Sequence, residues 1–86
     1  MAVTEGADIK QLTASAVDQT IDFEKNVSAV YIKTAGNIYI AFDREATNTD
    51  FLVASADGVI EFDIPCTELH ILGSGGTPLV YVIGRR

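Results

Sequence analysis

From about residue 27 to its C-terminal end, the chain is an almost unbroken series of short segments in which apolar and polar side chains alternate. Such alternation is typical of β-strands, because successive side chains of a strand point to opposite faces of its sheet. In 59–64, for example, Ile60, Phe62 and Ile64 are expected on the core face, with the acids between them in solvent. The segments expected to be strands are 8–13, 17–23, 29–34, 38–42, 51–54, 59–64, 67–72 and 79–83.

The first two segments also allow a second interpretation. Ile9, Leu12 and Ala16 have the spacing of one face of a short helix. β-Branched residues such as Thr13 and Thr20 favour strands, so we expect strands here as well. The last segment, 79–83, is apolar on both faces, which indicates either a central strand or a strand covered by another subunit.

Gly, Asn, Asp or Pro stands at most of the joints between these segments. Only Ala35, Gly36 and Asn37 separate the third and fourth expected strands. Gly and Asn tolerate the positive φ angles of a tight turn, so these two strands are expected to form a β-hairpin. The glycine-rich stretch 73–76 is expected to be a flexible hairpin tip. It leads into a strand and has no Lys, so it lacks the parts of a phosphate-binding loop.

Seven or eight short strands with frequent turns predict an all-β fold, a single small antiparallel β-sandwich or jelly-roll-like barrel. We expect a flexible N-terminal arm at 1–7 and one sandwich domain at 8–86. A chain of 86 residues buries only roughly 60–65% of its unfolded surface, so its stability margin is thin. The single cysteine, Cys66, excludes an internal disulfide, and metal-ligand spacing is absent. Oligomerisation or docking on a larger partner is therefore the expected support.

The net charge of −6 argues against a nucleic-acid or anionic-membrane partner, because an acidic surface repels both. No apolar run approaches the ~20 residues of a membrane span, and the N-terminus lacks the features of a secretory signal. We therefore expect a soluble protein made in a cytoplasm. Arg85 and Arg86 form the only concentrated basic feature, which is either a solvated tail or an ion-pairing hook for an acidic neighbour.

The chain has one His, one Cys and no Trp, so most catalytic constellations cannot be assembled. His70 has Glu68 two residues earlier on the same strand face, and the pair can interact. A half-exposed strand residue beside a surface acid is the favoured interpretation. No cation adjoins Cys66 in sequence to lower its pKa, which favours a buried structural thiol. We expect no enzymatic activity, no catalytic residues and no cofactor.

Two further groups of residues carry binding chemistry. Asp43, Glu45, Asn48 and Asp50 place oxygen-bearing side chains in one polar loop, as calcium sites do, but the spacing is not that of an EF-hand and Arg44 stands among the acids. A solvated loop without metal is the favoured interpretation.

The three tyrosines, Tyr31, Tyr39 and Tyr81, offer faces on which sugars can stack. Tyr39 shares a strand face with Ala41 and Asp43 and is expected to be exposed. Cross-strand packing is the commoner role of scattered tyrosines, and it is favoured here.

The order of segments from Val27 to Gly84 resembles that of small virion proteins of tailed bacteriophages. NVSAVYIKTAG leads into IYIAFD, a polar loop follows, and then FLVASADGVIEFDIPCTELHILGSGGTPLVYVIG. In those proteins a strand of the type VYIKN-G precedes piYIsFD, and then come L-pag-sieFD-p and t-LHI-s-gGt--v-V-G. The resemblance implies a sandwich of jelly-roll type that serves as a capsid decoration (cement) protein. It also implies binding to the major capsid protein or another virion protein, often as a trimer.

The expected location is thus the virion, after assembly in the host bacterial cytoplasm. The alternatives are an accessory protein of the neck, tail or fibre, or a carbohydrate- or receptor-binding module of a phage tail. Contacts of a sandwich usually lie on its loops, so the N-terminal arm, the loop 43–50, the tip 73–77 and the C-terminus are expected to form the interface. The interface residues expected are Asp43, Arg44, Glu45, Asn48, Asp50, Tyr39, Ser74, Thr77, Arg85 and Arg86.

Overall fold

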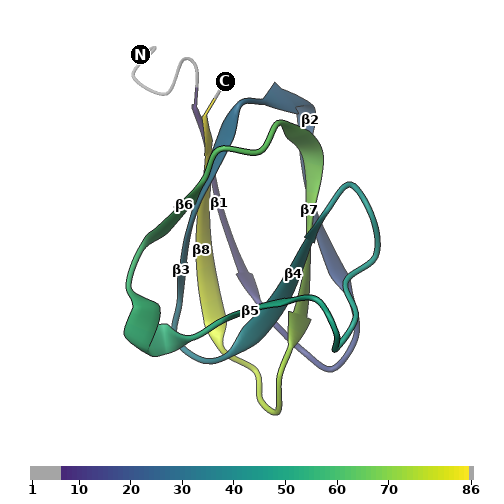
Figure 1. Ribbon diagram of the computed structural model, residues 1–86, viewed down its shortest axis with the longest axis vertical. Helices are drawn as coiled ribbons and strands as arrows, with labels where there is room; N and C mark the ends of the chain where they lie inside the picture. Colours follow the sequence, from purple (N-terminus) through teal and green to yellow (C-terminus); the bar gives the residue numbers. More distant parts are fainter. Residues whose placement is uncertain (1–6, 86) are drawn as a thin grey trace.

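The computed structural model of the protein describes residues 7–85, which form two four-stranded antiparallel sheets packed face to face (Figure 1). The predicted all-β sandwich is confirmed. One short 3₁₀-helix, η1 (Ser55–Asp57), follows the fifth strand. The strands are β1 (Ala7–Thr13), β2 (Gln19–Val27), β3 (Ala29–Thr34), β4 (Ile38–Phe42), β5 (Phe51–Val53), β6 (Ile60–Phe62), β7 (Cys66–Gly73) and β8 (Leu79–Arg85).

Sheet A has the strand order β1-β8-β3-β6, and sheet B has the order β2-β7-β4-β5. Among the described strands, only β4 and β5 are neighbours both in sequence and in one sheet. At every other connection between described strands, the chain leaves one sheet and enters the other. Each layer is therefore assembled from segments that lie far apart in the sequence.

The expected hairpin of 29–34 and 38–42 is wrong. The strand β3 lies between β8 and β6 in sheet A, whereas β4 lies between β7 and β5 in sheet B. The residues between them cross from layer to layer, and Gly36 does not have a positive φ. Instead the Thr34 hydroxyl donates to the Gly36 carbonyl at 2.6 Å and turns the chain locally. Alternation fixes which side chains face the core, and two such strands can face each other across the core as well as pair edge to edge.

The stretch 73–76 is likewise a connection between layers and not a hairpin tip, because β7 belongs to sheet B and β8 to sheet A. Gly75 has φ 88°, a conformation that glycine adopts without strain. The Ser74 N–H donates to the Asn37 carbonyl at 3.0 Å. The two connections thus support each other at one end of the sandwich.

The N-terminal half follows the expectations in outline. The helix alternative for the first segment is wrong, because β1 pairs with β8 along its whole length. The second segment begins at Gln19 and extends to Val27, with an irregular register in which Glu24 has φ 68°. Ala7 already belongs to β1, and the rest of the expected arm, 1–6, lies outside the described residues.

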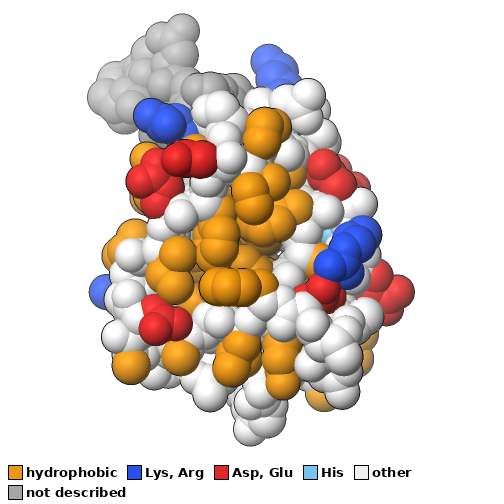
Figure 2. Space-filling model, viewed as in Figure 1, with side chains coloured by type: hydrophobic (Ala, Val, Ile, Leu, Met, Phe, Trp, Pro, Cys, Tyr) orange, Lys and Arg blue, Asp and Glu red, His pale blue; other side chains and the backbone are white. Residues whose placement is uncertain are grey.

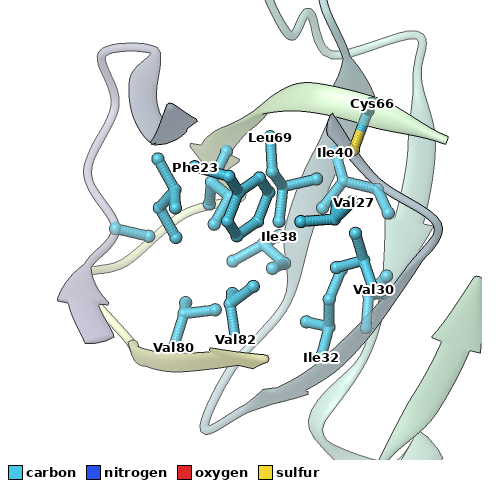
Figure 3. Packing of buried hydrophobic residues seen from close by; sticks show 14 residues of the cluster. Phe23, Val27, Val30, Ile32, Ile38, Ile40, Cys66, Leu69, Val80 and Val82 are labelled. Atoms are coloured by element: carbon cyan, nitrogen blue, oxygen red, sulfur yellow. The ribbon is translucent and has the colours of Figure 1, made fainter. Parts of the chain in front are cut away.

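The core lies between the two inward faces (Figure 3). Sheet A contributes mainly valines and isoleucines, and sheet B adds Phe23 and Leu69. Ile60 and Phe62 pack against this core as expected, but Ile64 does not and is 41% exposed. The reason is that β6 ends at Phe62. Pro65 cannot donate to a ladder, and the chain there crosses to sheet B. The fully buried aliphatic side chains are Val27, Val30, Ile32, Ile38, Val53, Leu69, Ile71, Val80 and Val82.

The surroundings of Gly84 show how closely the two layers approach each other. A Cβ atom added to Gly84 on β8 would lie 2.7 Å from Cε1 and 2.9 Å from Cδ1 of Phe23 on β2. We therefore expect Gly84→Ala to lower the free energy of unfolding by about 1–3 kcal/mol, the usual cost of overpacking a core. Urea denaturation followed by circular dichroism measures this change.

The control is Gly76→Ala, because a Cβ atom at Gly76 meets nothing within 4 Å. Its free energy of unfolding should stay within about 0.5 kcal/mol of that of the unchanged protein. Equal stability of the two variants would contradict the close approach of the layers at Gly84.

Candidate functional site

The only histidine is held between two carboxylates on the outer face of sheet B. Its Nδ1 lies 3.0 Å from Oδ2 of Asp18, and its Nε2 lies 2.9 Å from Oε1 of Glu68. The Thr20 hydroxyl is also within 3.2 Å of Nδ1. We call these four residues the His70 cluster. The contact of His70 with Glu68 was expected from the sequence; the contact with Asp18 was not.

The strand register builds this cluster. His70 on β7 is the Cα partner of Thr20 on β2, and Asp18 directly precedes β2. Asp18 also reaches in the other direction, since its Oδ1 accepts the N–H of Ala46 at 2.9 Å. Ala46 is buried, although it belongs to the polar loop between β4 and β5. The His70 cluster therefore fastens this loop to sheet B.

Electrostatics favour the charged imidazolium in this position. Burial alone lowers the pKa of His70, but the hydrogen bonds to Asp18 and Glu68 and the charges of these carboxylates outweigh it, so the pKa is raised above 6.5. With a proton on each ring nitrogen, both N–H groups donate to carboxylates and no lone pair remains to accept a proton. The arrangement suits a structural clamp better than a general base.

The acids of the loop 43–50 do not converge on one point. Asp50 pairs with Arg44 and also accepts the Thr47 N–H at 2.7 Å. The hydrogen bond from Arg44, followed by that from Thr47, holds the pKa of Asp50 well below its usual range. Within 7–85 no group of three or more His, Cys, Asp or Glu side chains is arranged to hold a metal ion.

Asp43, unlike the other loop acids, makes hydrogen bonds to residues outside the loop. Its Oδ1 accepts the backbone N–H groups of Thr67 at 2.9 Å and Glu68 at 2.8 Å. These bonds join the end of β4 to the start of β7, and they hold Asp43 at φ 58°. Glu45 and Asn48 are exposed. Asp43 thus ties the start of the loop to β7, whereas Asp50 is bonded within the loop.

The tyrosines do not form a common platform. Tyr31 and Tyr81 lie on the outer face of sheet A, whereas Tyr39 lies on sheet B beside Leu52 and Leu72. Tyr39 is half-buried and Ala41 is buried, so the expectation of an exposed Tyr39 is wrong. A sugar-stacking site made of all three tyrosines is therefore excluded.

The other expected interface residues lie at opposite ends of the sandwich (Figure 1). Ser74 and Thr77 line an open depression at the end where β7 and β8 are joined. Arg85 is exposed at the other end, where its carbonyl accepts the N–H of Ser28 at 2.6 Å. Arg86 lies outside the described residues.

Cys66 is buried, as expected for a structural thiol. Burial, followed by the charge of Asp43, raises its pKa to about 11. A thiol with so high a pKa is almost fully protonated near neutral pH, so it is a poor nucleophile.

Sequence analysis missed an apolar surface on one side of the sandwich. Phe62 on β6 contacts Phe42 on β4 and Phe51 on β5, with both pairs of ring centroids 5.6 Å apart. We call these three phenylalanines the open-edge cluster, because they close the gap between the edge strands of the two sheets. Figure 2 shows hydrophobic side chains gathered along this side. Phe51 is 60% exposed. In the sequence, the position of this aromatic residue directly after the polar loop is the feature that could have indicated the apolar surface.

Comparisons with protein-family models, with curated proteins and with solved structures found no match for this chain. Within the described part of the chain, no helix has the length and apolar character needed to cross a membrane.

The His70 cluster predicts a pH dependence. A raised pKa means that the contribution of His70 to stability is fully present below about pH 6.5 and is lost as the pH rises through the folded-state value. We therefore expect the free energy of unfolding to fall as the pH rises above about 6.5 and through the folded-state pKa of His70. Urea denaturation at several pH values measures the fall, and the proton resonances of the only imidazole report the folded-state pKa.

His70→Gln is the matched control, because it keeps a hydrogen-bonding side chain without a titrating charge. Its stability should change much less over the same pH range. A folded-state pKa at or below 6.5 would contradict the clamp.

The bonds of Asp43 predict a second effect. Asp43→Ala leaves the N–H groups of Thr67 and Glu68 without their acceptor, so the free energy of unfolding should fall by about 1–3 kcal/mol. Asp43→Asn keeps an acceptor oxygen and tolerates positive φ, so it should lose clearly less. If thermal unfolding ranks the two variants in the opposite order, Asp43 does not act through these bonds.

Proposed function

We propose that this protein is a non-enzymatic structural protein of a bacteriophage virion, a capsid decoration protein that binds the head lattice through its open-edge cluster. The observation that carries the proposal is this apolar side, on a small domain with a net charge of −6 (Figure 2). Contiguous exposed apolar surface on a small soluble domain marks protein contacts. Aromatic side chains in particular are enriched where interfaces lose their water.

The strands on either side of the cluster fit such a contact. β5 and β6 are edge strands of three residues each, and the cluster lies between them. An edge strand presents free N–H and C=O groups to a partner. A strand of the lattice protein that pairs with either edge also covers Phe51 and Phe62, which combines backbone hydrogen bonds with apolar burial.

The resemblance of residues 27–84 to small virion proteins selects the class of partner, the major capsid protein or another virion protein. The net charge of −6 supports this role, because like charge keeps free copies apart in the host cytoplasm before they meet the particle. The His70 cluster and the bonds of Asp43 hold the loop 43–50 in place, so the frame around β5 is formed before docking. A preformed surface loses less entropy on binding.

Co-sedimentation with capsid shells that lack this protein tests the proposal. We expect binding of the unchanged protein, and a loss of at least about tenfold in affinity for Phe51→Asp, because a charge is placed in the centre of the contact. Leu52→Asp is the matched control. Leu52 is the next residue of β5, is also exposed, and faces the outer side of sheet B beside Tyr39.

Leu52→Asp should keep shell binding within about twofold, since rim and off-site charges change affinity little. Binding to purified tails in place of shells would favour the accessory role in the neck, tail or fibre. A lack of binding to both particles, together with the absence of copies from purified virions, would overturn the proposal.

A further inference from the structure

The outer face of sheet A is a second apolar surface, distinct from the open-edge cluster. An antiparallel sheet with one wet face normally alternates apolar and polar residues. The central strand β8 departs from this rule, because Val80 and Val82 point into the core while Tyr81 and Ile83 point outward and are 46% and 39% exposed. Of the two explanations that the sequence left for this strand, the structure shows the first, an inner strand, and the outer side chains of β8 have no cover in the described chain.

The strand register makes this surface continuous. Ile83 is the Cα partner of Ile9 on β1 and of Tyr31 on β3. Tyr81 is likewise the partner of Gln11 on β1 and Lys33 on β3. Directly opposed residues of neighbouring strands lie on the same face, so two rows of side chains cross three strands. We call the outward residues of these rows, together with Val59 and Glu61 beside β3, the A face.

The A face has a projection on one side of β8 and a depression on the other. Ile9 on β1 is 65% exposed. Across β8, a shallow hollow of about 160 Å³ is lined by Tyr31, Lys33, Val59 and their neighbours on β8. A two-fold axis along β8 exchanges these two sides. It lays Ile9 of each copy over the hollow of the other, and Gln11 over Lys33.

We propose that the A face is where a second copy of this chain binds, through such a two-fold contact. Because projection and hollow belong to the same surface, the contact is complementary to itself and closes at two copies. This inference does not rest on the proposed function, since it uses neither the open-edge cluster nor the resemblance.

The charges fit a contact between copies. The two rows and the adjacent part of β6 carry one cation and one anion, Lys33 and Glu61. The carboxylates of Asp18, Asp22 and Glu68 lie on the sheet B side instead. Two A faces therefore meet without bringing together most of the net charge of −6.

The small area of the A face limits the strength of the contact between two copies. Three strands with a spacing of about 4.8 Å and about six residues of length, with the three residues of β6 beside them, give a face of about 350 Å² per copy. The total of about 700 Å² is smaller than the roughly 1,200–2,000 Å² of stable specific interfaces. The dimer should therefore be weak and depend on concentration. Copies held side by side on a surface would associate more completely, because their effective concentration is higher.

Sedimentation velocity from about 10 μM to about 1 mM tests the proposal, a range that spans the affinities of weak contacts. The unchanged protein should shift from one copy towards two. Ile9→Lys should remain monomeric over the same range, because it places a charge in the apolar hollow of the partner.

Val17→Lys is the matched control, since Val17 is 71% exposed and lies in the connection between β1 and β2, outside the A face. It should dimerise like the unchanged protein. Circular dichroism of each variant checks that the strands are retained.

A dilution series followed by amide chemical shifts supplies a readout that needs no variant. The concentration-dependent shifts should fall on the outward residues of β1, β8 and β3. A constant monomer mass, a mass of three copies, or shifts confined to the open-edge cluster would each overturn the two-fold contact on the A face.

Discussion

The structure depends on the burial of two strand faces against each other. The described chain holds no disulfide, and its core consists of branched aliphatic side chains with one phenylalanine, Phe23, fully between the layers. Each sheet alone would expose its inward face to water, so neither layer is stable without the other. Phe23 packs so closely on the backbone of Gly84 that the spacing of the layers is fixed at that end.

The same constraint explains why apolar side chains remain outside. The edge strands β5 and β6 have three residues each, and a gap lies between these edges of the two sheets. Phe42, Phe51 and Phe62 fill this gap from the side, and the outermost ring stays partly in water. On sheet A, the inner strand β8 carries apolar side chains on both of its faces. The apolar surfaces thus follow from the geometry of a small two-layer core, and they are the places where we propose that other proteins bind.

Sequence reasoning identified all eight described strands. It also placed Ile60 and Phe62 on the core face, where they pack, but it was wrong for Ile64, which is exposed. It could not assign strands to layers, because a turn of three residues joins strands in one sheet or across two equally well, as the segment around Gly36 demonstrates.

The site was predictable only where its partners are local. Glu68 and His70 are two residues apart on one strand, so their contact followed from the period of the strand. Asp18 is 52 residues away from His70, and no local pattern joins them. The acids of the loop 43–50 resembled metal ligands by type, but backbone N–H groups satisfy Asp43, and Thr47 and Arg44 satisfy Asp50.

The pairing of β1 with β8 has a consequence for how the protein is made. Ala7 lies opposite Arg85, so the first described strand hydrogen-bonds to the last one. While the ribosome is still adding the middle of the chain, β1 has no neighbour, because its only partner in sheet A is β8. The nascent polypeptide must keep these apolar segments from aggregating until β8 emerges, and the two layers can then close in a single late step.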